Sequence, residues 1–138
     1  MRKLFLAVTI VFLSTTIGCS QTSSSKDSTK KATISFTETS HDYGTVAWGG
    51  DGTYNFVFKN TGSEPMLLTD VRTSCGCTVP VWPKEPIKPG KSDKITVKYN
   101  TRISGKFSKT ITVYSSAANS PVTLKIHGTV EQRKENNK

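Results

Sequence analysis

The sequence predicts an all-β protein, an immunoglobulin-like antiparallel β-sandwich of seven to eight strands. Three observations predict this fold class. Apolar residues alternate with polar ones from residue 33 onward, turn-forming residues separate the short runs, and no segment has the spacing of an amphipathic helix. Short strands at this spacing are typical of a sandwich in which two sheets pack their alternating inner faces together.

The individual strands follow from the alternating runs. The runs are 33–36, 54–59, 66–73, 94–99, 106–113 and 122–127. Another strand is expected at HDYGTV (41–46), because Asp42 can accept backbone hydrogen bonds and Gly44 can take a positive φ. The side chains predicted to face the core are Ile34, Phe36, Tyr54, Phe56, Phe58, Leu67, Val71, Ile95, Val97, Tyr99, Phe107, Ile111, Val113, Val122, Leu124 and Ile126.

Turn signals separate these strands at 48–52, 60–65, 84–92, 100–105 and 115–121. Asn60 and Gly62 fit a corner of the chain, and Pro89–Gly90 fits a type II turn, in which glycine takes the positive φ.

Residues 1–18 have the pattern of a secretory signal peptide: two positive charges, an apolar run at 4–13, then small and polar residues. The apolar run is shorter than the roughly 20 residues that a spanning helix needs. The stretch TIGC (16–19) resembles the lipobox of bacterial lipoproteins, whose cysteine thiol accepts a diacylglycerol. Thr16 stands where that motif usually has Leu. Cys19 is therefore the expected lipid attachment site, and an ordinary cleaved signal with a chance cysteine is the alternative.

The rest of the chain divides into three parts. Residues 19–31 are rich in Ser, Thr and Lys and are expected to form a flexible lipidated tether. Residues 32–131 form the folded domain, and 132–138 a disordered tail. No acidic run follows Cys19, so the expected location is the bacterial cell envelope, lipid-anchored and facing the periplasm, with the outer membrane favoured over the inner.

The formal net charge of +9 is compatible with nucleic-acid binding. Two observations argue against it: an exported protein does not meet nucleic acid, and no aromatic residues alternate with the basic ones to stack on bases. Eight basic residues lie between positions 84 and 109, against Glu85 and Asp93. Several occupy outward strand positions and could attract anionic lipid headgroups or acidic partners. The alternative is a solvated edge that discourages pairing between sheets.

Cys75 and Cys77, in the stretch TSCGCTVP, are the candidate chemical site. In an extended strand their Cα atoms would lie roughly 6.5–7 Å apart, at or past the limit of a relaxed disulfide. A bend at Gly76 would allow a disulfide that closes only a tiny loop. Two thiolates could instead hold a soft ion such as Cu(I) or Zn²⁺, although no CxxC or HxxxH spacing supplies further ligands.

The favoured interpretation of the two cysteines is that they pack as small buried hydrophobes. They share odd-numbered positions with apolar side chains, so an uninterrupted strand would turn all of them toward the core. These neighbours are Leu67, Val71, Val79 and Val81. A free thiol pair is unusual in an oxidising envelope, which keeps the redox, disulfide and metal interpretations open.

No catalytic residue is predicted. His41 is adjacent to Asp42, but nothing in the sequence arranges a nucleophile, a base and an orienting group. The chain has neither a nucleophile elbow nor a glycine-rich phosphate loop. We therefore expect no enzyme activity and no cofactor.

Four stretches carry a family resemblance: HDYGTV (41–46), FKNTGSEPMLL (58–68), SCGCTVP (74–80) and IKPGKSDKITVKYNT (87–101). With GKFSKTITV and LKIHGTV, they make the chain resemble the bacterial DUF1573 family of uncharacterised exported proteins over about 100 residues. That family is similar to immunoglobulin-like sandwiches of the ASH and major-sperm-protein type. The resemblance implies a fold and an envelope setting, and no established reaction.

Together these features predict a membrane-tethered envelope lipoprotein that acts as a non-catalytic binding or scaffolding module. Its contacts would be the membrane, through lipid on Cys19, and an unknown envelope protein. The alternative is a thiol-dependent protein that uses Cys75 and Cys77 for Cu(I) or Zn²⁺ binding or for redox chemistry.

Overall fold

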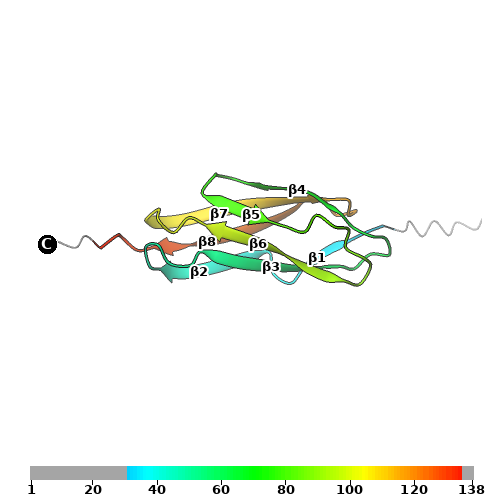
Figure 1. The fold of residues 1–138 in the computed structure, drawn as a ribbon, viewed down its shortest axis with the longest axis horizontal. Helices are drawn as coiled ribbons and strands as arrows, with labels where there is room; N and C mark the ends of the chain where they lie inside the picture. The colour runs from blue at the N-terminus through cyan, green and yellow to red at the C-terminus, as the bar shows by residue number, and fades with distance from the viewer. Residues whose placement is uncertain (1–30, 135–138) are drawn as a thin grey trace, which may run out of the picture.

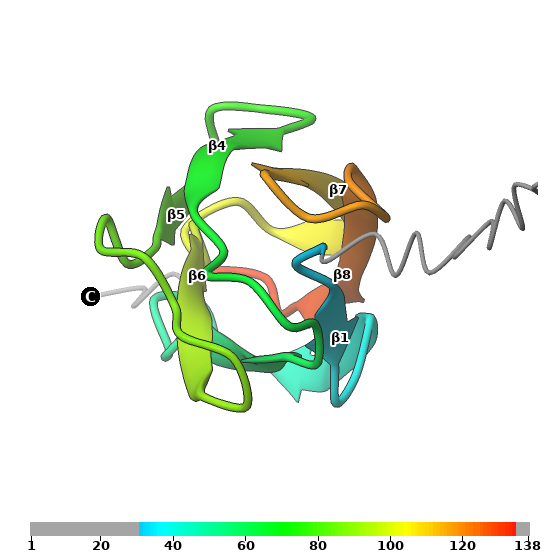
Figure 2. The ribbon, with the colours of Figure 1, turned by 90° about the vertical axis from the view of Figure 1, so that its right-hand side faces the viewer.

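The computed structural model describes residues 31–134, which form a β-sandwich of two four-stranded sheets (Figures 1 and 2). The strands are β1 (Ile34–Phe36), β2 (Ser40–Val46), β3 (Thr53–Asn60), β4 (Leu68–Thr73), β5 (Thr78–Val81), β6 (Ser92–Tyr99), β7 (Gly105–Ser115) and β8 (Val122–Val130). Sheet A has the order β1-β3-β6-β5, and sheet B has the order β2-β8-β7-β4. The predicted all-β immunoglobulin-like sandwich is confirmed.

One strand pair departs from the antiparallel arrangement. β2 runs parallel to β8, whereas the other pairs are antiparallel. The chain crosses from sheet A to sheet B between β1 and β2 without reversing direction, so the first strand is split between the two sheets (Figure 1). HDYGTV therefore forms a strand, as predicted, and this strand lies at the edge of sheet B with a parallel partner.

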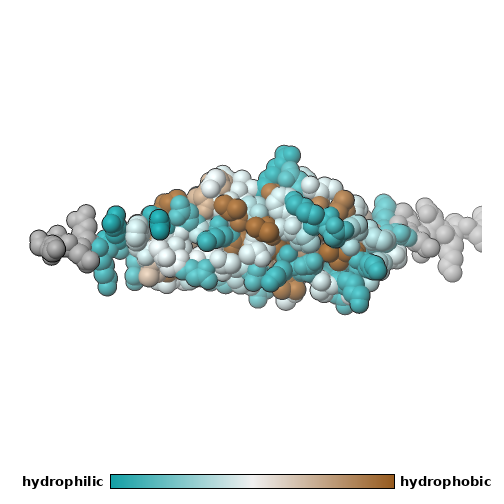
Figure 3. Space-filling view, in the orientation of Figure 1, coloured by the Kyte–Doolittle hydropathy of each residue, from teal (hydrophilic) through white to brown (hydrophobic). Residues whose placement is uncertain are grey.

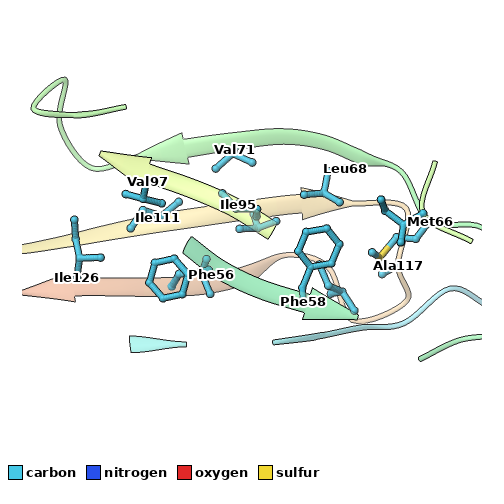
Figure 4. Packing of buried hydrophobic residues seen from close by; sticks show 14 of the residues in the cluster. Phe56, Phe58, Met66, Leu68, Val71, Ile95, Val97, Ile111, Ala117 and Ile126 are labelled. Atoms are coloured by element: carbon cyan, nitrogen blue, oxygen red, sulfur yellow. The ribbon is translucent and has the colours of Figure 1, made fainter. Parts of the chain in front are cut away.

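The core lies between the inner faces of the sheets, and Figure 4 shows its close packing. Every side chain predicted to face the core is buried or packs against it, except Leu67. The pairing of β4 with β7 shifts between Leu68 and Asp70, so that Leu68 and Val71 face inward. Leu67 is 38% exposed for this reason, and its predicted place in the core is wrong.

Asn60 is a polar side chain that is fully buried at the end of β3. Its Nδ2 donates to the backbone oxygens of Glu64 (2.8 Å) and Ile87 (2.9 Å). Its Oδ1 accepts from the backbone nitrogens of Gly62 (3.0 Å) and Thr33 (3.4 Å). The carboxamide thus satisfies backbone groups from three separate segments, which confirms the predicted corner at Asn60 and Gly62.

Asn119, in the turn between β7 and β8, closes the free edge of β1. Its Nδ2 donates to the Ile34 oxygen (2.8 Å), and its Oδ1 accepts from the Ile34 nitrogen (3.1 Å). The Ala118 nitrogen also donates to the Ala32 oxygen (2.9 Å). Because Asn119 lies in a turn between two strands of sheet B and β1 belongs to sheet A, this side chain also joins the two sheets.

Two predicted glycine turns are present. Gly90 has φ +75°, and the Lys91 nitrogen donates to the Lys88 oxygen at 3.1 Å, as in a type II turn. Gly44 has φ +62°, and its nitrogen donates to Asp42 Oδ1 at 2.8 Å, at the point where β2 bulges.

The predicted signal peptide, Cys19 with its lipid, nearly all of the tether and the last residues of the tail lie outside the described residues. Within residues 31–134, no helix has the length and apolar character to cross a membrane.

We predict that Asn60→Ala lowers the free energy of unfolding by about 2–3 kcal/mol, because four hydrogen bonds of a fully buried carboxamide to buried or partly buried backbone groups are lost. Urea denaturation of the purified protein measures this difference. Ser63→Ala, on an exposed residue of the same turn, is the matched control and should change stability little. Equal effects of the two substitutions would contradict the structural role of the buried carboxamide.

Candidate functional site

The CxC corner, residues 74–77, is where the chain leaves sheet B after β4 and enters sheet A at β5 (the turn that joins the strands labelled β4 and β5 in Figure 1). Cys75 and Cys77 are joined there by a disulfide, with their Cα atoms 5.3 Å apart. The chain bends at these residues, so the Cα separation is shorter than in an extended strand.

The expectation that both thiols are free and packed in the core is therefore wrong. Both cysteines are half-buried, and their sulfurs are bonded to each other. The argument from odd-numbered positions fails because it needs an uninterrupted strand, and this strand ends at Thr73. In β5 the odd-numbered residues point to solvent: Val79 is 58% exposed and Val81 is 63% exposed.

Backbone hydrogen bonds hold the CxC corner in place independently of the disulfide. The Ser74 nitrogen donates to the Thr110 oxygen (2.9 Å), and the Thr110 nitrogen donates to Ser74 Oγ (3.2 Å). On the other side, the Asn100 nitrogen donates to the Cys77 oxygen (2.8 Å). One end of the corner is thus fixed to β7 and the other to the residue after β6.

The free edge of β5 is largely blocked against further strand pairing. In an antiparallel pair, every second residue of a strand forms hydrogen bonds with the neighbouring strand. The Cys77 oxygen bonds to the Asn100 nitrogen, so the backbone groups of Thr78 and Pro80 point away from β6. The Thr78 nitrogen donates to the Cys75 oxygen (3.4 Å), and Thr73 Oγ1 donates to the Thr78 oxygen (3.2 Å). Pro80 has no N–H to offer. This edge is a poor template for a partner's strand.

The two sulfurs differ in their surroundings. Cys77 packs against the core cluster, and its Sγ lies 4.0 Å from the Thr78 hydroxyl. Cys75 is not among the residues that pack against the core. Within the described part of the chain, no three or more His, Cys, Asp or Glu side chains gather to hold a metal ion.

The outer face of sheet A is a second candidate, because none of its outward positions is acidic. The one acidic residue in its strands is Asp93, which pairs with inward-facing Phe58 but is exposed at the end of β6, beside Val57 and Lys94. Val57 pairs with Lys94, and Val79 pairs with Lys98, so exposed valines lie beside lysines. Figure 3 shows brown surface on this face, where Figure 1 places β5, among teal patches. The outward residues are Ser35, Thr53, Asn55, Val57, Lys59, Val79, Val81, Ser92, Lys94, Thr96 and Lys98.

His41 and Asp42, adjacent in sequence, point to opposite sides of β2. The His41 ring stacks on Tyr54 with ring centroids 3.5 Å apart and meets Tyr43 edge-on at 4.6 Å. Burial lowers the pKa of His41 below its ordinary value. It also raises the pKa of Tyr43 to about 12, and the Tyr43 hydroxyl donates to the Gly52 oxygen at 2.8 Å. His41 is thus part of an aromatic contact between the sheets.

Strand pairing brings Ser108, His127 and Asp42 into a row on the outer face of sheet B. No single stretch of the sequence predicts this row, because its members come from three strands. His127 Nε2 lies 3.7 Å from Asp42 Oδ2, while Nδ1 is buried without a partner. Among the described residues, no hydrogen bond joins His127 to Ser108. The row therefore lacks the activated hydroxyl that a hydrolytic triad requires.

We predict that the double substitution of Cys75 and Cys77 by serine lowers the free energy of unfolding by at most about 1.6 kcal/mol. That is the chain-entropy value for a loop of three residues. The hydrogen bonds at Ser74 and Cys77 should keep the corner folded. Denaturant titration of the oxidised protein and the double variant measures the difference, and a loss above about 4 kcal/mol would identify a structural brace instead.

Comparison with solved structures shows the same sandwich in other proteins. A protein of unknown function from Porphyromonas gingivalis W83 aligns with TM-score 0.62 and 18% identity, covering 75% of this chain and 48% of that one. The present chain thus spans about half the length of that protein. The ASH / PapD-like domain of human CEP192 aligns with TM-score 0.63 and 8% identity, covering 76% and 89%. The VesB protease of Vibrio cholerae aligns with TM-score 0.55 and 12% identity, covering 75% and 32%.

These likenesses concern the fold, which is that of ASH and PapD-like sandwiches. The sequence has no significant match among curated proteins. A match to a family does exist, over residues 34–130, and the family is described as "Protein of unknown function (DUF1573)". The match covers the sandwich from β1 to β8, including the CxC corner. The chain therefore belongs to the DUF1573 family.

Proposed function

We propose that this protein is a non-catalytic binding module of a bacterial envelope, tethered to the membrane by lipid on Cys19. We further propose that the outer face of sheet A binds an acidic protein of the envelope. The observation that supports this assignment most is that lysines, and no acidic residues, occupy the outward positions of that face, with Asp93 the one acidic residue in its strands.

The composition of the face suits an acidic protein surface. Lys59, Lys94 and Lys98 are exposed and supply positive charge, which steers an acidic partner and fixes its orientation. Val79 and Val81 lie next to Lys98 and Thr96 across the sheet and supply apolar area that a partner can cover. Since sheet A is blocked at the β5 edge and closed by Asn119 at the β1 edge, a partner of this sheet would bind through side chains of the face and not by adding a strand.

The outer face of sheet B has a different charge pattern. It carries Asp42 at one end and Asp70 at the other, and Asp70 forms a 2.7 Å ion pair with Arg72. Lys106 and Lys125 are also exposed on this face, so its charges are mixed. Sheet A is therefore the face that an acidic partner would select.

The sequence and the position of the first described residues support the tether. Lys31 lies at one end of the sandwich, where its oxygen accepts from the Ser63 nitrogen (3.1 Å). The expected tether from Cys19 to the start of the domain would span about 20 Å on average if it behaves as a flexible chain, which would keep the domain close to the membrane while it turns freely. Two or three acyl chains, each adding about 0.8 kcal/mol per buried CH₂, are enough for a stable anchor.

We predict that Cys19→Ser moves the protein from the membrane fraction to the aqueous fraction in its native host, because the thiol that accepts the lipid is lost. Detergent phase partition and mass spectrometry of the mature N-terminus measure the change. Wild-type protein that carries no lipid and partitions into the aqueous fraction would contradict the proposed tether. The binding role would then be judged separately.

We predict that Lys94→Glu with Lys98→Glu weakens capture of the envelope partner at least about tenfold, because the face then repels an acidic surface. Lys106→Glu with Lys125→Glu changes the net charge equally on sheet B and is the matched control. Pull-down from envelope extract, repeated at raised salt, measures both pairs. Equal loss from both pairs, or capture that does not depend on salt, would contradict binding through sheet A.

A further inference from the structure

We propose that Cys75 and Cys77 form a reversible redox couple that exchanges its disulfide with a dithiol of a partner molecule. In this couple Cys75 is the sulfur that is attacked, and Cys77 is the sulfur that leaves. This activity is independent of the proposed binding role, and it rests on three features of the CxC corner.

The first feature is that the disulfide does not connect distant parts of the fold. It connects residues only two positions apart, within a single corner, and joins no separate elements of the fold. Closing so small a loop removes little entropy from the unfolded chain. A bond of this kind can open and close while the sandwich stays folded.

The second feature is that the corner keeps its shape without the disulfide. Ser74 is held to Thr110, and Cys77 to Asn100, through hydrogen bonds that involve neither sulfur. Thr73 Oγ1 also lies 2.9 Å from the Cys75 oxygen. After reduction the two thiols therefore remain close neighbours, and reoxidation needs no search through conformations.

The third feature is the asymmetry of the two sulfurs. Cys77 packs against the core, so an incoming thiolate reaches Cys75 more easily. The Thr78 hydroxyl, 4.0 Å from Cys77 Sγ, can donate a hydrogen bond to the thiolate that forms when Cys77 leaves. A stabilised thiolate is the better leaving group in thiol–disulfide exchange.

The exchange proceeds in two steps. A thiolate of the partner attacks Cys75 Sγ, the Cys75–Cys77 bond breaks, and its electron pair leaves on Cys77 Sγ, which then takes a proton. A mixed disulfide now joins the partner to Cys75. The partner's second thiolate then attacks the partner sulfur that is bonded to Cys75. The Cys75 thiolate leaves and is protonated. The partner dithiol is thereby oxidised by two electrons to a disulfide, and its two protons balance those gained by the cysteines.

Two measurements on the full chain test this proposal. In the first, dithiothreitol is the probe dithiol, alkylation with mass spectrometry counts free thiols at Cys75 and Cys77, and circular dichroism follows the fold. We expect full reduction of the folded protein and reoxidation when dithiothreitol is removed. A disulfide that resists dithiothreitol until the protein is unfolded would overturn the redox couple.

The second measurement identifies the attacked sulfur, with reduced glutathione as a monothiol probe. The oxidised wild-type protein is incubated with glutathione, free thiols are alkylated at low pH, and peptide mapping locates the glutathione adduct and the alkylated cysteine. We expect the adduct on Cys75 and the alkyl group on Cys77 about tenfold more often than the reverse, because Cys75 is the more accessible sulfur. Peptide mapping separates these adducts from any at Cys19, and the double serine variant is the blank. Equal amounts of the two adducts, or more adduct on Cys77, would overturn the assignment of the attacked sulfur. The double serine variant should still capture the envelope partner. Failure of the redox proposal can therefore be distinguished from failure of the binding proposal.

Discussion

The buried carboxamide of Asn60 fixes how the chain comes together at one end of the sandwich. The inner faces of the two sheets supply the apolar area that drives folding, but apolar packing alone does not specify which loops meet. Asn60 binds the segment before β1, its own turn and the connection that leads to β6. Asn60 itself is fully buried and its partners are buried or partly buried backbone groups, so arrangements of these loops that leave such groups unpaired are costly.

The sequence predicts the sandwich well because alternation is a local property. Each strand between β3 and β8 that alternates strictly, such as Ile95–Val97–Tyr99, buries the side chains expected of it. The glycine turns at Gly44 and Gly90 are likewise local, since a positive φ depends on one residue and its neighbours. Asn60 could also be placed at a corner from its own stretch, although its full burial depends on distant segments.

The candidate site was harder to predict, because it depends on where the chain changes sheets. One switch, between Thr73 and Thr78, reverses the face to which odd-numbered residues point, and it turns Val79 and Val81 outward. The bulge before Asp70 has the same effect on Leu67. The acid-free face of sheet A and the row of Ser108 and His127 arise from register between strands, which no single stretch of sequence specifies.

The position of the CxC corner along the molecule has a consequence for reach. In Figure 1 the first described residues lie at one end of the long axis, and β4 runs away from that end toward the corner. β4, with 6 residues, measures roughly 20 Å at the usual rise per residue. An anchor before residue 31 would therefore attach to the end of the sandwich that lies away from the disulfide. A domain that turns freely on such an anchor can present the disulfide to partners whose thiols stand clear of the membrane surface.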